Sequence, residues 1–137
     1  MNQPLSMDQA FLSKLNAIIR DNLQNEKFGV DDLSREMGMS YSKIHRKIKS
    51  LAKKSVSQYI REFRLQQAME MLLNNVATVS EIAFSVGFSD PAYFSNCFHA
   101  YYGYPPGEVK KRNPENRVIT AENLTPGPTK IQRSKEK

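Results

Sequence analysis

Residues 82–98, which read IAFSVGFSDPAYFSNCF, decide the fold of this chain. Apolar residues at helical spacing lead up to Gly87, and glycine readily takes the left-handed conformation that ends a helix. Asp90 and Pro91 then mark the start of a second helix, because Asp caps free backbone N–H groups and Pro tolerates the first helical position. A short helix, a tight turn and a second helix form a helix-turn-helix unit, which this stretch predicts.

The same pattern occurs earlier in the chain, where Leu33 and Met37 precede Gly38. The two glycines lie 49 residues apart, and inward apolar positions follow the first one at Ile44 and Ile48. A single match is weak, because any hairpin of two helices with a glycine turn resembles it. Two copies are much stronger and predict two helix-turn-helix units.

The remaining segments are also predicted to be helical. Three hydroxyl residues precede a Gln or Glu by three positions, which is the spacing of a capping box: Ser6 with Gln9, Ser55 with Gln58, and Thr78 with Glu81. We expect helices over residues 8–24, 30–37, 41–52, 56–74, 79–86, 91–101 and 107–112. The predicted fold class is all-α, with about seven helices forming two helix-turn-helix subdomains joined by a long linker helix.

These elements suggest an organisation into successive parts. A leader over residues 1–7 precedes a first subdomain over 8–54, and a linker helix over 55–75 leads to a second subdomain over 76–112. The tail, residues 113–137, is polar and broken by proline, so we expect it to be disordered.

Positive charge is concentrated in one part of the chain. The net charge is +6, to which residues 43–64 contribute +7 and residues 65–107 contribute −3. Basic proteins often bind nucleic acid or anionic membranes, although a merely soluble basic protein has the same net charge. The basic segment covers most of the second helix of the first predicted unit and the start of the linker helix, which favours DNA as the partner.

Composition excludes several other classes. The chain has no apolar run near the roughly 20 residues that span a membrane and no secretory signal, so we expect no membrane contact. Its single cysteine, Cys97, fits a reducing cytoplasm. The sequence shows no group of ligands at metal spacing and no glycine-rich phosphate loop, so we predict no enzyme, no cofactor and no metal site.

Two stretches resemble a known family of bacterial transcription regulators. Residues 82–90 with Tyr93, Phe94, Ser95, Phe98 and residues 103–106 resemble the C-terminal motif of AraC/XylS-type regulators, and residues 58–68 resemble their linker helix. The resemblance covers about residues 11–111, and residues 39–49 are similar to the output domains of hybrid two-component regulators. Where the family usually has Gly and then Pro before the linker helix, this chain has Lys53 and Val56.

In a helix-turn-helix unit the second helix enters the major groove and its N-terminal half meets base edges. In the first unit, about residues 41–52, we expect four base-reading side chains: Tyr41, Ser42, His45 and Arg46. Arg46 can give two parallel hydrogen bonds to guanine, whereas for His45 a phosphate contact or no contact is an equal alternative. Three lysines are expected on phosphates: Lys43, Lys47 and Lys49.

In the second unit, about residues 91–101, the groove-facing set has no cation. We expect base reading from Pro91, Ala92, Ser95 and Asn96, of which Asn96 can pair with adenine. Pure packing is the alternative for this set. Further phosphate contacts are expected at Arg61 and Arg64 of the linker, for which surface salt bridges are the alternative. Tyr93, for which core packing is the alternative, and His99 are the remaining expected phosphate contacts.

These expectations describe a sequence-specific transcription factor domain that binds double-stranded DNA as a monomer. A non-specific architectural DNA protein is the alternative, and RNA polymerase is a further candidate partner. Because the chain holds no sensor domain, it is either a small stand-alone regulator or the output module of a larger sensor protein, and we expect the latter.

Overall fold

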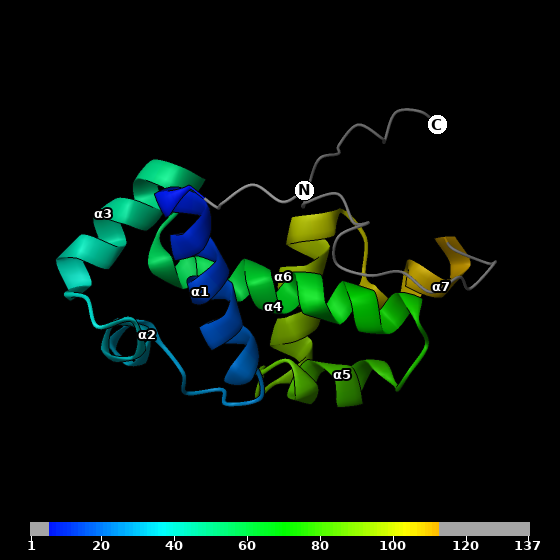
Figure 1. Cartoon of the computed structure of the whole chain (residues 1–137). Helices are drawn as coiled ribbons and strands as arrows, with labels where there is room; N and C mark the ends of the chain where they lie inside the picture. Colours follow the sequence, from blue (N-terminus) through cyan, green and yellow to red (C-terminus); the bar gives the residue numbers. More distant parts are fainter. Residues whose placement is uncertain (1–5, 113–137) are drawn as a thin grey trace, which may run out of the picture. The chain divides into compact units, whose positions relative to one another are not determined.

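A computed structural model describes residues 6–112, and this part of the chain consists of helices and turns without a strand. Along the chain the elements are α1 (Met7–Asp21), α2 (Val30–Met37), α3 (Tyr41–Ala52), α4 (Val56–Leu73), α5 (Val79–Ser85), α6 (Pro91–Tyr102), the 3-10 turn η1 (Pro106–Glu108) and α7 (Val109–Arg112) (Figure 1). The predicted all-α fold is confirmed. The predicted tail and residues 1–5 of the predicted leader lie outside the described residues.

Two helices begin at complete capping boxes that the sequence predicts. The Ser6 hydroxyl accepts from the Gln9 amide at 3.0 Å, and the Gln9 side chain accepts from the Ser6 amide at 2.9 Å. Thr78 and Glu81 make the same exchange at 3.1 and 3.0 Å. Each box gives partners to two backbone N–H groups that the first turn of a helix leaves free.

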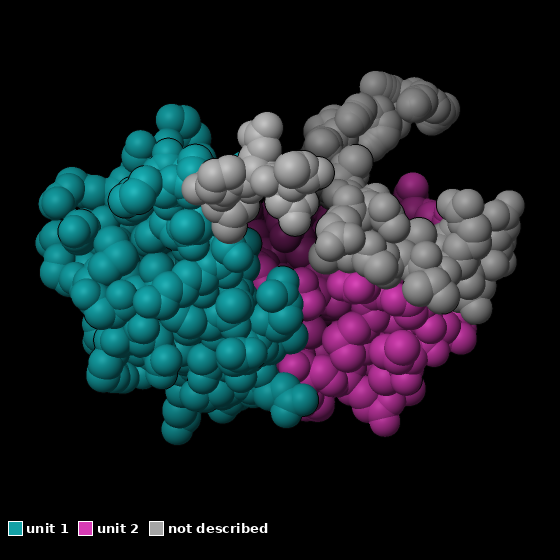
Figure 2. All heavy atoms as spheres, viewed as in Figure 1, with its two compact units in different colours: residues 1–61 teal, residues 62–137 magenta. Residues whose placement is uncertain are grey.

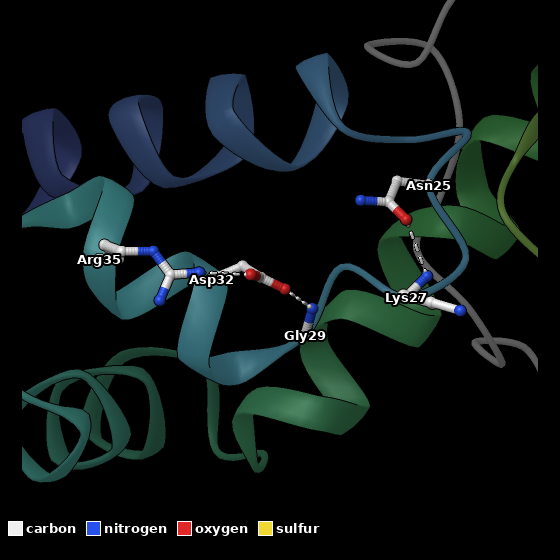
Figure 3. A network of polar contacts seen from close by, with 5 residues as sticks. All are labelled: Asn25, Lys27, Gly29, Asp32 and Arg35. Atoms are coloured by element: carbon white, nitrogen blue, oxygen red, sulfur yellow. Dashed lines mark hydrogen bonds and ion pairs between the residues drawn. The ribbon is translucent and has the colours of Figure 1, made fainter.

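A further cap, at the start of α2, is one that the sequence analysis did not predict (Figure 3). Asp32 accepts from the Gly29 amide at 3.0 Å and forms an ion pair with Arg35 at 2.6 Å. In the preceding loop, the Asn25 side chain accepts from the Lys27 amide at 3.0 Å. Both carboxylate oxygens of Asp32 are therefore engaged, and the loop enters α2 in a defined direction.

Both predicted glycine turns are present. Gly38 has φ +68° and Gly87 has φ +93°. Residues other than glycine rarely adopt a positive φ. In each turn the glycine N–H and the next N–H bond back to the last turn of the helix, a Schellman motif. The bonds that span five positions of the chain run from the Met39 N–H to the Ser34 carbonyl (3.1 Å) and from the Phe88 N–H to the Ala83 carbonyl (2.9 Å).

The chain divides into two compact units, Met1–Arg61 and Glu62–Lys137, coloured teal and magenta in Figure 2. The division falls inside α4, so this helix supplies buried residues to both units. The first core contains Phe11, Leu15, Ile19, Phe28, Leu33, Met37, Ile44, Ile48, Val56 and Ile60. The second contains Phe63, Leu65, Ala68, Met69, Leu72, Ile82, Ala83, Val86, Phe88, Phe94, Phe98 and Val109.

The repeat seen in the sequence extends over three helices in each copy. The starts of α1 and α4 lie 49 residues apart, as do the starts of α2 and α5, whereas α3 and α6 start 50 residues apart. The extra residue lies in the second turn, between Gly87 and the cap of α6 at Asp90. Each copy is therefore a helix followed by a helix-turn-helix pair.

The first and the last helix differ from their predicted ranges. The first helix ends at Asp21 instead of residue 24: Asn22 leaves the helical region with φ −112° and ψ 20°, and its side chain donates to the Ile18 carbonyl at 2.8 Å. The last helix is split into η1 and the short α7. Val109 anchors α7 in the core with 2% of its surface exposed, and the Arg112 guanidinium lies 4.1 Å from the Tyr104 ring centre.

Residues 6–112 lack two kinds of feature. No helix between residues 6 and 112 is both long enough and apolar enough to cross a membrane. In the same range, no three His, Cys, Asp or Glu side chains are grouped so that they could hold a metal ion.

Candidate nucleic-acid interface

The outer face of α3 is centred on Arg46. The helix starts at Ser40, whose hydroxyl accepts from the Lys43 amide at 3.1 Å. Ile44 and Ile48 are completely buried, and at 100° per residue Arg46 points away from both of them. The exposed side chains of α3 are Tyr41, Ser42, Lys43, Arg46, Lys49 and Ser50. Three of the four predicted base readers and two of the three predicted phosphate lysines therefore lie on the solvent side of this helix.

His45, the fourth predicted base reader of α3, lies at the border of this face. The residue is half-buried, and its ring stacks on Tyr41 with 6.0 Å between ring centres and 18° between ring planes. Its Nδ1 atom is buried and has no hydrogen-bond partner among the described residues. The position of His45 is compatible with holding Tyr41 in place as well as with reading a base.

Lys47 differs from the other lysines of α3 in its direction. Its Nζ lies 3.5 Å from the Asp8 carboxylate and 5.2 Å from the centre of the Phe11 ring, so its side chain reaches back to α1. Lys47 is half-buried, whereas Lys43 and Lys49 are exposed. Part of the charge of Lys47 is therefore already balanced within the protein.

On α6 the corresponding centre of the outer face is Asn96. Phe94 and Phe98 are completely buried, and Asn96 is exposed opposite them, as Arg46 is on α3. Of the other predicted contacts on α6, Ala92, Tyr93 and His99 are exposed, and Pro91 and Ser95 are half-buried. The Tyr93 ring lies 5.9 Å from the Phe88 ring, so part of this side chain rests on the core. The face is neutral, because α6 carries no Lys, Arg, Asp or Glu.

The two arginines predicted to contact phosphate from α4 have different surroundings. Arg61 is half-buried, whereas Arg64 is only 6% exposed. The Arg64 guanidinium donates to the Val86 carbonyl at 2.7 Å, and burial lowers the pKa of Arg64. A buried guanidinium bonded to the backbone cannot reach a phosphate at the surface, so the expectation for Arg64 is corrected to a structural contact.

Two exposed residues beside the predicted surface, Ser50 and Lys53, are not among the expected DNA contacts. Ser50 is exposed one helical turn after Arg46, and the spacing of four residues was the signal that would have found it. Lys53 ends α3 with φ +62°, in the left-handed region, at the position where the resemblance implied a glycine. Its N–H donates to the Lys49 carbonyl and its ammonium to the Ser50 carbonyl, at 3.0 and 3.2 Å.

Comparison with protein families places this arrangement in a known group. The family model described as a helix-turn-helix domain matches residues 33–112. The chain is 36% identical over 110 residues to histidine kinase P4 of Formosa agariphila, a match that covers 80% of this chain and 8% of that protein. It is 27% identical over 111 residues to the Msm operon regulatory protein of Streptococcus mutans, covering 81% of this chain and 40% of that protein. The chain therefore spans less than half the length of these curated relatives.

A solved structure shares the fold. The DNA-binding domain of AdpA, a global transcriptional factor solved in complex with a target DNA, is similar with a TM-score of 0.68 and 24% sequence identity. The match covers 80% of this chain and 97% of that one. At this level of identity the likeness establishes the fold.

Proposed function

Since the chain belongs to the AraC-type helix-turn-helix family of transcription regulators, we propose that it binds a specific double-stranded DNA site with α3 and α6 as its two reading helices. One observation carries the proposal. On both helices a polar side chain, Arg46 or Asn96, is exposed directly opposite two buried apolar residues. Each helix can therefore rest on its own core and still present a hydrogen-bonding side chain to a major groove.

The chemistry proposed for the two helices differs. On α3, Arg46 with Ser42 reads base edges, and the exposed Lys43 and Lys49 bind phosphates on either side. On α6, Asn96 with Ala92 reads bases through neutral contacts. Tyr41, His45, Pro91 and Ser95 remain proposed base contacts at the borders of these faces, and Arg61, Lys47, Tyr93 and His99 remain proposed phosphate contacts.

We place this domain at the output end of a longer sensor protein, acting in the cytoplasm on promoter DNA without enzymatic activity of its own. The similarity to a histidine kinase of which this chain matches 8% supports the role of an output module. RNA polymerase is the proposed protein partner.

Selection from a pool of random duplexes tests the proposal. We expect the chain to enrich one site with two separate groups of preferred base pairs, and to bind it as one protein per site, because both reading helices belong to one chain. A pool that remains random after selection would instead indicate a non-specific architectural protein. An obligate stoichiometry of two chains on a minimal site, measured by sedimentation, would contradict the monomeric form of the proposal.

A further inference from the structure

Arg64 is the one charged side chain that the fold buries among residues 6–112. Its Nη1 atom donates to the carbonyl of Val86, the residue that ends α5 immediately before Gly87. Carbonyls in the last turn of a helix have no partner within the helix, so the guanidinium satisfies one of them. The contact joins α4 to the first residue of the turn that leads to α6.

The equivalent position in the first copy holds an apolar residue. Because α1 and α4 start 49 residues apart, Leu15 occupies the place of Arg64 in the repeat, and Leu15 is completely buried. A leucine there supports the fold of the first copy without any cost of desolvating a charge. Packing alone therefore does not require arginine at this position. In some proteins a buried polar group is retained because it favours one arrangement of the packed helices over others.

A second polar contact joins α4 to the other helix of the pair. The Gln66 side-chain amide donates to the Tyr101 hydroxyl at 2.8 Å, near the C-terminal end of α6. Arg64 thus holds the end of α5, and Gln66 holds the end of α6. Both helices of the second helix-turn-helix pair are tied to α4 by hydrogen bonds, which are directional, in addition to apolar contacts, which are not.

We propose that Arg64 is a positioning residue for DNA reading by α6: its bond to Val86 fixes the direction in which the chain leaves α5, and so the orientation of Asn96 toward its base pair. The inference rests on the proposed function. It predicts that loss of the guanidinium changes the base preference of the second half-site while leaving the reading by α3 intact.

The binding test uses the full chain with Arg64→Met, which keeps the length of the side chain, and Arg64→Lys, which keeps a charged donor. The matched control is Arg61→Met, which removes the same charge from the same helix. Binding is measured to single-base variants of the selected site at several salt concentrations. We expect Arg64→Met to lower discrimination about tenfold at the base pairs read by α6 and to leave the salt dependence unchanged. Arg64→Lys should restore part of the discrimination.

Two results of this test would overturn the inference. If Arg64→Met weakened binding to all sites equally and flattened the salt slope by about one unit, as we expect for Arg61→Met, Arg64 would be a phosphate contact. If Arg64→Met lowered the melting temperature without changing any base preference, its role would be structural alone.

A measurement without DNA separates this inference from the proposed function. Amide hydrogen exchange should become faster at Gly87 and Phe88 in Arg64→Met and stay unchanged at the equivalent Gly38 and Met39. That result would show that the Arg64 bond holds the turn after α5 even if the wild-type chain showed no sequence preference, an outcome that would refute the proposed function. Unchanged exchange at Gly87 and Phe88 would overturn the inference while the proposed function stood.

Discussion

The hydroxyl of Tyr59 on α4 donates a hydrogen bond of 2.6 Å to Oδ1 of Asn16 on α1, and the two residues are 43 positions apart in the chain. Burial raises the pKa of Tyr59, an effect that the bond to Asn16 partly opposes. Tyr59→Phe removes the hydroxyl, so Oδ1 of the half-buried Asn16 loses this hydrogen-bond donor. We expect a loss of about 1 kcal/mol in the free energy of unfolding, measured with urea. The control is Tyr41→Phe, which removes a hydroxyl from an exposed residue. An equal loss of stability in this control would show that the effect of Tyr59→Phe does not come from the bond to Asn16.

The left-handed glycine turns predict a difference between two glycines with equally open surroundings. A Cβ atom added at Gly38 or at Gly107 would meet nothing within 4 Å, but only Gly38 of this pair has a positive φ, +68°. Gly38→Ala should therefore destabilise the fold by about 1–2 kcal/mol through backbone strain alone. Gly107→Ala should change the stability little. Thermal unfolding of both variants gives the comparison, and equal melting temperatures would refute the argument.

Lys53 stores strain that a substitution can release. Its φ of +62° is in the left-handed region, where a residue with a Cβ atom is about 1 kcal/mol less stable than glycine. Lys53→Gly should stabilise the chain by about 0.5 kcal/mol, because relief of the strain exceeds the loss of the exposed bond to the Ser50 carbonyl. The control is Lys54→Gly, which has no positive φ and should destabilise. A lower denaturation midpoint for Lys53→Gly would show that the bond to Ser50 dominates.

The charges of the two reading helices predict separate effects on DNA binding. Arg46→Ala should cost about 1–3 kcal/mol and relax the preference at one base pair, whereas Lys43→Ala should weaken binding to all sequences and flatten the salt slope by about one unit. Asn96→Ala should change the preference in the second half-site and leave the salt slope unchanged, because no phosphate charge is neutralised there. Titrations of a panel of operator variants at several salt concentrations measure all three effects. The assignment would be reversed if Asn96→Ala abolished binding and Arg46→Ala had little effect.

The capping box of α5 predicts a dependence of stability on pH. Hydrogen bonds from the backbone and side chain of Thr78 lower the pKa of Glu81 in the folded chain. Since the folded value lies below the unfolded value of about 4.3, the contribution of Glu81 is present above that pH and is lost as the pH falls through the folded pKa. Unfolding free energies measured between pH 6 and pH 3 should therefore fall more steeply for the wild type than for Glu81→Gln, which keeps an acceptor but does not titrate. Parallel curves would exclude this role.

The exposed faces of α3 and α6 could largely be predicted from the sequence because each helix carries its own periodic pattern. The buried positions Ile44 and Ile48 fix the opposite face of α3, so Arg46 and Ser42 followed from spacing alone. The same reasoning placed Asn96 on the exposed side of α6. It could not separate Lys47 from Lys43, because both flank the buried stripe and only the position of Asp8 on α1 distinguishes them.

The sequence by itself determined the helices, their caps and the two glycine turns, because these depend on residues within about four positions of one another. The partners of Arg64 and Tyr59, which lie 22 and 43 residues away, were decided only by the tertiary structure. The sequence leaves a phosphate contact and a surface salt bridge open for Arg64, and the buried bond to the Val86 carbonyl is neither of these. Only 6% of Arg64 is exposed to water in the folded chain, and a buried charge must find an acceptor inside the fold.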